Sequence, residues 1–134
     1  MPNRSVNPDG LFPTVALGFS QVVQATGATT VHISGQTAWD AERNVIGGRD
    51  LGEQTRQALR NLRAAVEAGG GTMSDIVALR IYVVNYSPTC ADTISTALRE
   101  CFSREGSPAA TWLGVQSLAT PDFLVEIEAT SVLD

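Results

Sequence analysis

The sequence is poor in the residue types that mark several classes of protein. Its 134 residues include one histidine, two cysteines and 6% aromatic residues. Because His32 is the only histidine, a histidine-based metal cluster or catalytic triad would have to use this one residue, and we expect no metal site. Cys90 and Cys101 fall in one predicted helix, about 16 Å apart along its axis at ~1.5 Å per residue, which excludes a disulfide within that helix.

Basic charge is also scarce. Nine basic residues against fourteen acidic residues give a net charge of −5. Nucleic acids require a basic surface, and membrane surfaces attract basic amphipathic helices, so we expect neither partner. No apolar run approaches the ~20 residues of a membrane-spanning helix, and the first residues lack the apolar core of a signal peptide. We therefore expect a cytoplasmic protein with reduced cysteines.

The composition and length of the chain indicate one folded domain over residues 1–134. Hydrophobic residues make up 43% of the chain, an ordinary globular balance, and the length suffices for a substantial core. Periodicity predicts strands at 19–25 and 29–36 joined in a hairpin, a helix over 50–68, a strand over 76–84, a helix from 87 that ends before 106, and strands over 109–118 and 123–129.

This order of elements predicts an α+β fold, an α/β layer in which a single mixed sheet has two helices on one face. Alternation in the last strand places Glu126 and Glu128 on the face away from the helices, and Arg80 has the same orientation in the strand 76–84. The chain has no element left to cover that second face. Because uncovered faces of this size usually meet another subunit, we expect a homo-oligomer.

Four phrases spread along the chain are distinctive. They are ALGFSQ at 16–21, ISGQ at 33–36, NLRAAVEAGG at 61–70, and PA at 108–109 with VEIEA at 125–129. Together they resemble the corresponding phrases of the RidA/YjgF family, the reactive intermediate deaminases: G-P-Y-S-Q, T-S-G-Q, a helix N-l-k-a-i-l-e-a-a-G, and the two ends of a C-terminal signature. The likeness covers nearly the whole chain, from about residue 15 to residue 132.

The resemblance implies a chorismate-mutase-like fold and a trimer whose sheets form a central barrel, with a small-molecule cleft at each subunit interface. Active members of the family hydrolyse enamines and imines and release ammonia without a metal or an organic cofactor. By this resemblance Glu126 positions or activates water, and Gly35 lines the cleft. Phe19 stands where the family usually has tyrosine, and Ser95 falls near a position often occupied by asparagine.

Ala110 departs from the family, whose members have an arginine here that binds the substrate carboxylate. A methyl group cannot form the two parallel hydrogen bonds of a guanidinium group. Trp112 lies on the same strand face as Ala110, where we expect it to reshape or partly fill the cleft. Arg80 either pairs with Glu126 or Glu128 inside the trimer or supplies an anion contact from another direction.

Two classes of function follow. The first is an enzyme that deaminates an enamine or imine by hydrolysis, with a substrate other than a simple 2-imino acid. The second is a non-catalytic trimeric module that binds a small ligand or a regulatory partner in the same cleft. Some family members have been described as endoribonucleases, an activity that the acidic charge disfavours here. The residues expected to bind ligand are Phe19, Gly35, Arg80, Ser95, Ala110 and Trp112.

Overall fold

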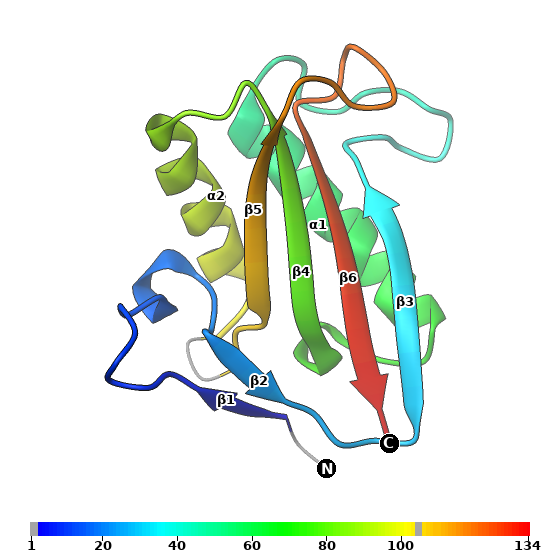
Figure 1. Ribbon diagram of the computed structural model, residues 1–134. Coiled ribbons are helices and arrows are strands. Elements are labelled where there is room, and N and C mark those ends of the chain that lie inside the picture. The colour runs from blue at the N-terminus through cyan, green and yellow to red at the C-terminus, as the bar shows by residue number, and fades with distance from the viewer. Residues whose placement is uncertain (1–2, 104–105) are drawn as a thin grey trace.

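The computed structural model describes residues 3–103 and 106–134, and its main element is a four-stranded sheet (Figure 1). The strands lie in the order β3 (Thr29–Gln36), β6 (Val125–Leu133), β4 (Ile76–Val84) and β5 (Ala109–Val115). β6 pairs antiparallel with β3 and with β4, whereas β5 runs parallel to β4. The sheet is therefore mixed, as the sequence predicts.

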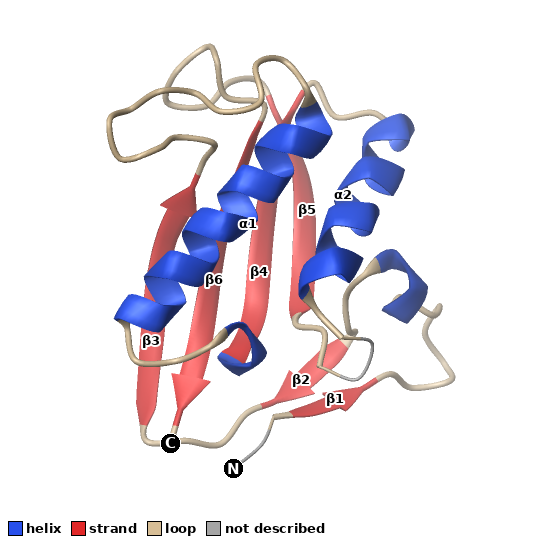
Figure 2. Cartoon of the chain, turned by 180° about the vertical axis from the view of Figure 1, so that it is seen from behind, coloured by secondary structure: helices blue, strands red, loops and turns tan. Residues whose placement is uncertain are grey.

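Two helices, α1 (Leu51–Ala68) and α2 (Pro88–Cys101), cover one face of this sheet (Figure 2). α1 begins at Asp50, whose side chain accepts a hydrogen bond of 2.9 Å from the backbone N–H of Glu53 and so caps the helix. In α2, Pro88 occupies the first turn, where its missing N–H costs no helical hydrogen bond. Two short 3-10 helices, η1 (Val15–Leu17) and η2 (Met73–Asp75), complete the helical elements of the described residues.

The hydrophobic core lies between the two helices and the sheet. The buried apolar side chains come from both helices and from alternate positions of β4 and β6, and they include Leu59, Leu62, Ile94, Leu98, Leu79, Ile81, Val125 and Ile127. Glu126 and Glu128 alternate with these residues and are only half-buried on the other side of β6. The predicted division of the sheet into a helix-covered and an uncovered face is thus confirmed.

The expected hairpin between segments 19–25 and 29–36 does not form. β2 is limited to Val22–Gln24 and pairs antiparallel with β1 (Arg4–Val6), which the sequence analysis did not predict. β3 pairs instead with β6 at the far end of the chain. Gly27, expected in a hairpin turn, lies against the end of β6: a Cβ at this position would be 2.4 Å from the carbonyl oxygen of Leu133. The segment therefore carries the chain from the small ribbon to the main sheet.

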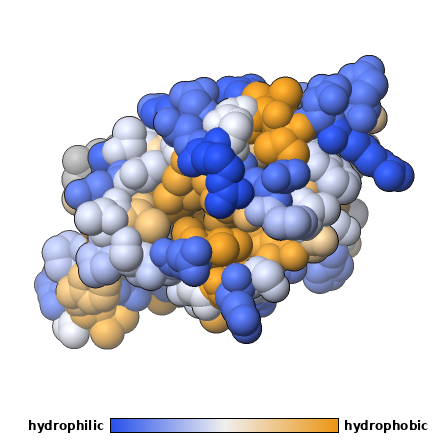
Figure 3. All heavy atoms as spheres, turned by 90° about the horizontal axis from the view of Figure 1, so that it is seen from above, coloured by the Kyte–Doolittle hydropathy of each residue, from blue (hydrophilic) through white to orange (hydrophobic). Residues whose placement is uncertain are grey.

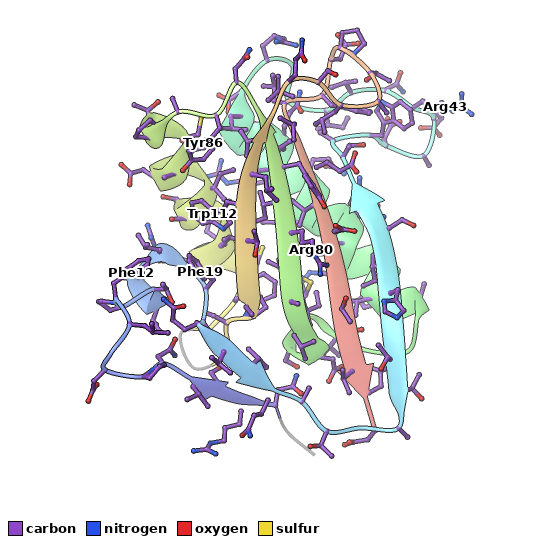
Figure 4. All side chains as sticks on the ribbon, in the orientation of Figure 1. Phe12, Phe19, Arg43, Arg80, Tyr86 and Trp112 are labelled. Atoms are coloured by element: carbon purple, nitrogen blue, oxygen red, sulfur yellow. The ribbon has the colours of Figure 1, made fainter. Side chains whose placement is uncertain are left out.

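The uncovered face of the sheet is the surface turned to the viewer in Figure 1. Several large apolar side chains are exposed: Leu11, Phe12, Leu17, Val22, Tyr86 and Leu113. Figure 4 shows Phe12 and Tyr86 on the β5 side of the molecule. Within the described part of the chain, no helix is long and apolar enough to cross a membrane.

Candidate functional site

Glu126 and Gly35 come together from β6 and β3. A Cβ built on Gly35 would lie 2.1 Å from Glu126 Oε2 and 2.8 Å from Glu126 Cγ. The Glu126 side chain therefore occupies the space that a side chain at position 35 would need. The pairing of β3 with β6 also shifts register between Ile33 and Gln36, so this end of β3 departs from the regular ladder. The structure thus places two residues of the expected site in contact.

A hollow of about 660 Å³ opens beside this pair. Its described lining residues are Gly35, Gln36, Thr37, Trp39, Asp40, Ala41, Asn61, Ala64, Ala65, Ala119, Phe123 and Glu126. Trp39 and Phe123 pack edge to face, with ring centroids 4.8 Å apart. Seen from the loop end of the molecule, hydrophobic residues gather in the middle of this surface between hydrophilic residues (Figure 3). The hollow is of the size that holds a small ligand, and its largely apolar wall carries the carboxylates of Asp40 and Glu126.

Side chains of α1 hold the loops around the hollow. The amide of Asn61 donates hydrogen bonds of 2.8 Å to the carbonyl oxygens of both Thr37 and Trp39. About two turns earlier in α1, buried Gln54 donates to the carbonyls of Gly48 (2.7 Å) and Asp122 (2.9 Å) and accepts a bond from the backbone N–H of Leu124. Both loops that shape the hollow are therefore fixed to a single rigid helix.

Sequence reasoning did not identify Trp39, Asn61 or Phe123. Asn61 begins the third of the four distinctive phrases, which was the one available signal for its importance. Trp39 lies in a segment without regular periodicity, and Phe123 begins the predicted strand 123–129, although β6 itself begins at Val125. Only the fold brings these two rings into contact.

Arg80 lies on the uncovered face, where its Cα is opposite those of Glu128 in β6 and Thr111 in β5 (Figure 4). Among residues 3–103 and 106–134, no carboxylate is within ion-pair distance of its guanidinium group. Instead, the hydroxyl of Tyr82 donates a hydrogen bond to the Glu128 carboxylate. This hydrogen bond, together with burial, raises the pKa of Tyr82 above its ordinary value. The pairing of Arg80 within a trimer stays a prediction.

Ala110, Trp112 and Phe19 lie near one another at the β5 edge. Ala110 and Trp112 are in register with Leu79 and Ile81 of β4, so both are on the helix-covered face and pack against the core. The rings of Phe19 and Trp112 are in contact, with centroids 5.7 Å apart and an interplanar angle of 54°. The prediction that Ala110 and Trp112 share a face is confirmed, but that face is opposite to the one that carries Glu126.

Ser95 lies in α2, close to the turn that precedes Phe19. Its side chain is 2% exposed, and its backbone oxygen would be 3.3 Å from a Cβ built on Gly18. Its hydroxyl oxygen and the indole nitrogen of Trp112 are both buried and have no hydrogen-bond partner among residues 3–103 and 106–134. Ser95 therefore belongs to the β5 side of the molecule with Phe19 and Trp112.

The six expected ligand residues and Glu126 thus occupy separate places in one chain. Gly35 and Glu126 lie at the β3 side, Arg80 lies on the central strand β4, and the other four lie at the β5 side: Phe19, Ser95, Ala110 and Trp112. The described lining of the hollow includes none of the β5-side residues. No group of three or more His, Cys, Asp or Glu residues in the described part of the chain could hold a metal ion.

The mixed sheet with two helices on one face is the chorismate-mutase-like α+β fold of the Rid and YjgF family structures that the chain resembles. A model of the family described as Endoribonuclease L-PSP matches residues 12–133. A 2-iminobutanoate/2-iminopropanoate deaminase from Dermatophagoides farinae is 33% identical over 116 residues, which are 87% of this chain and 86% of that protein. The chain belongs to the RidA/YjgF family, and the resemblance drawn from the four phrases is confirmed.

Solved structures agree with this assignment. YyfB from Yersinia pestis, a Rid family protein of unknown function, superposes with a TM-score of 0.92 and 42% identity, covering 99% of this chain and 100% of that one. A member of the YjgF/YER057c/UK114 family from Mycobacterium tuberculosis superposes with a TM-score of 0.65 and 29% identity, covering 98% and 99% of the two chains.

Proposed function

We propose that this protein hydrolyses the C=N bond of a small enamine or imine that is not a simple 2-imino acid, with Glu126 acting on water. The observation that carries the proposal is the Glu126 carboxylate, held against Gly35 on the wall of a largely apolar hollow. A carboxylate on a rigid strand is suited to proton transfer with a bound water. The relative named as an iminobutanoate and iminopropanoate deaminase supports the reaction class.

The chemistry requires one water and releases one ammonia. The water oxygen attacks the imine carbon while Glu126 accepts a water proton, and the nitrogen takes up a proton to form a carbinolamine. The C–N bond then breaks as the C=O bond forms, so that imine and water become a carbonyl compound and ammonia. An enamine first takes a proton on carbon to become the imine. All nine basic residues are arginines, so a Schiff base on an enzyme lysine has no part in this route.

The assembly expected from the family explains why the expected residues are divided between two edges. In a ring of three chains, the β5 edge of one subunit would face the β3 edge of the next, which would place Phe19, Ser95, Ala110 and Trp112 opposite the Gly35–Glu126 pair. The uncovered sheet face and its exposed Leu113 support such a homotrimer. A cytoplasmic location, in which the two free cysteines remain reduced, likewise remains a prediction.

The test measures ammonia and carbonyl release from imines generated in situ, including 2-aminoacrylate. We expect Glu126→Gln to lower the rate on its substrate by about 10²-fold or more, since this is the usual contribution of a positioned acid or base. We expect Ala110→Arg to raise activity on 2-aminoacrylate, because it restores a bidentate carboxylate contact. An unchanged rate in Glu126→Gln would contradict the assigned role. A wild-type protein that binds ligands but accelerates no imine would instead be a non-catalytic binding module.

A further inference from the structure

The hollow beside Glu126 is lined by negatively charged groups and by no positively charged group of the described residues. Among its described lining residues, the ionisable ones are Asp40 and Glu126, both acidic, and neither arginine nor histidine is present. Arg43, the arginine nearest to Asp40 in the sequence, is exposed and points away from the molecule at the tip of the loop in Figure 4. Within one subunit, a ligand carboxylate in this hollow would therefore meet the like charge of Asp40 and Glu126, and none of the described lining residues would supply a cation.

Asp40 is held in place as an anion by its own loop. Its Oδ1 accepts hydrogen bonds from the backbone N–H groups of Glu42 (2.9 Å) and Asn44 (2.8 Å), and its Oδ2 accepts one from the Asn44 side chain (3.1 Å). These hydrogen bonds hold the pKa of Asp40 below its usual value, and the bond from the Asn44 backbone has the largest effect. The carboxylate is thus ionised at neutral pH.

The apolar part of the hollow suits a cation with a hydrophobic substituent. Trp39 is half-buried and Phe123 is 3% exposed, so both rings are fixed by packing, and Asn61 ties the Trp39 backbone to α1. An aromatic ring attracts a cation placed over its face, and indole does so best among the side chains. Ala64, Ala65 and Ala119 leave room beside the two rings.

We propose that the hollow selects a carboxylate-free imine of the kind formed by oxidation of a primary amine, bound as its iminium cation. The hydrophobic substituent packs on Trp39 and Phe123, and the C=N group lies toward Glu126. This inference rests on the proposed function and specifies its substrate class. The acidic hollow attracts the iminium ion, whose carbon is also more electrophilic toward water than that of the neutral imine. Water and the iminium ion become an aldehyde and ammonium.

Two matched pairs of imines test the proposal by turnover. An amino-acid oxidase acting on alanine and phenylalanine supplies the carboxylate-bearing imines, and an amine oxidase acting on ethylamine and 2-phenylethylamine supplies the same skeletons without the carboxylate. We expect wild-type kcat/KM to be at least about tenfold higher for each carboxylate-free partner, and highest for the phenyl compound. Asp40→Asn should reduce this preference severalfold. Glu42→Gln is the matched control, because Glu42 is an exposed residue of the same loop that does not line the hollow. This variant should leave the preference for the carboxylate-free imine unchanged.

Binding of unreactive analogues separates this inference from the proposed function. We expect titration calorimetry to show that 2-phenylethylammonium binds and that 3-phenylpropanoate does not. We also expect Trp39→Leu to weaken binding of 2-phenylethylammonium by about tenfold and Asp40→Asn to weaken it severalfold. If the cation binds as expected but no imine is hydrolysed, the proposed function fails and the ligand class stands. Equal or tighter binding of the carboxylate, faster turnover of carboxylate-bearing imines, or equal effects of Asp40→Asn and Glu42→Gln would overturn the inference.

Discussion

At position 35, the absence of a side chain leaves room for the Glu126 carboxylate. In Gly35→Ala, the new Cβ would meet Glu126 Oε2 at 2.1 Å, so the carboxylate must move. A misplacement of about 1 Å at a reacting group can cost ~10²-fold in rate, and we expect a loss of that order in kcat. Thermal unfolding should change little, because the displaced atoms belong to a half-buried side chain and not to the backbone, and because Gly35 has no left-handed φ. Gly10→Ala is the control, because no atom of the described residues lies within 4 Å of the position that its Cβ would take.

Tyr82 gives a prediction on pH dependence. Its hydrogen bond to Glu128 raises its pKa, so the folded protein holds the phenolic proton more tightly than the unfolded chain does. The resulting stability is complete below the unfolded pKa of about 10 and is lost as the pH rises through the folded pKa. Absorbance titration near the phenolate band should therefore show Tyr82 ionising later than an ordinary tyrosine, with Tyr82→Phe identifying its phase. Glu128→Ala should move that phase to lower pH, and an unmoved phase would contradict the assignment.

At the scale of elements, α1 is the support of the hollow as well as a wall of the core. Asn61→Ala removes both bonds to the loop at Thr37 and Trp39, and leaving these half-buried carbonyls unpaired costs up to about 1–3 kcal/mol. We expect a loss of that order in the free energy of unfolding, a change in tryptophan fluorescence, and weaker binding in the hollow. Glu67→Ala, an exposed change on the same helix, should leave all three measurements unchanged. Equal effects of the two variants would show that Asn61 has no special role.

The elements also show how far the sequence predicts this structure. Both helices and the alternation of β4 and β6 follow from local periodicity, because buried residues recur with the period of the element that buries them. The pairing of β3 with β6 and the β1–β2 ribbon do not follow, because strand pairing depends on segments far apart in the chain. The same limit applies to the site. Gly35 and Glu126 are found through their motifs, whereas Trp39 and Phe123 become partners only in the folded chain.

At the scale of the whole molecule, the uncovered face and the divided site lead to one prediction about assembly. We expect light scattering to give a mass about three times the 14.2 kDa of the chain. Leu113 is 40% exposed, and its backbone is in register with that of Tyr82 on the uncovered face. Leu113→Glu would bury a charge at a subunit contact and should dissociate the trimer. A monomer in the wild type would contradict this expectation directly.

The role of Arg80 follows from combining this assembly with the charge of the hollow. If the substrate carries no carboxylate, Arg80 is not needed to bind one, and its guanidinium group instead pairs with the glutamates of the uncovered face inside the trimer. Arg80→Ala should then weaken assembly at low protein concentration, while binding of 2-phenylethylammonium persists in whatever trimer remains. Arg60→Ala, on the exposed surface of α1, should leave the trimer intact. A stable Arg80→Ala trimer that loses only its affinity for carboxylates would assign Arg80 to ligand binding. The same result would contradict the proposal that the substrate carries no carboxylate.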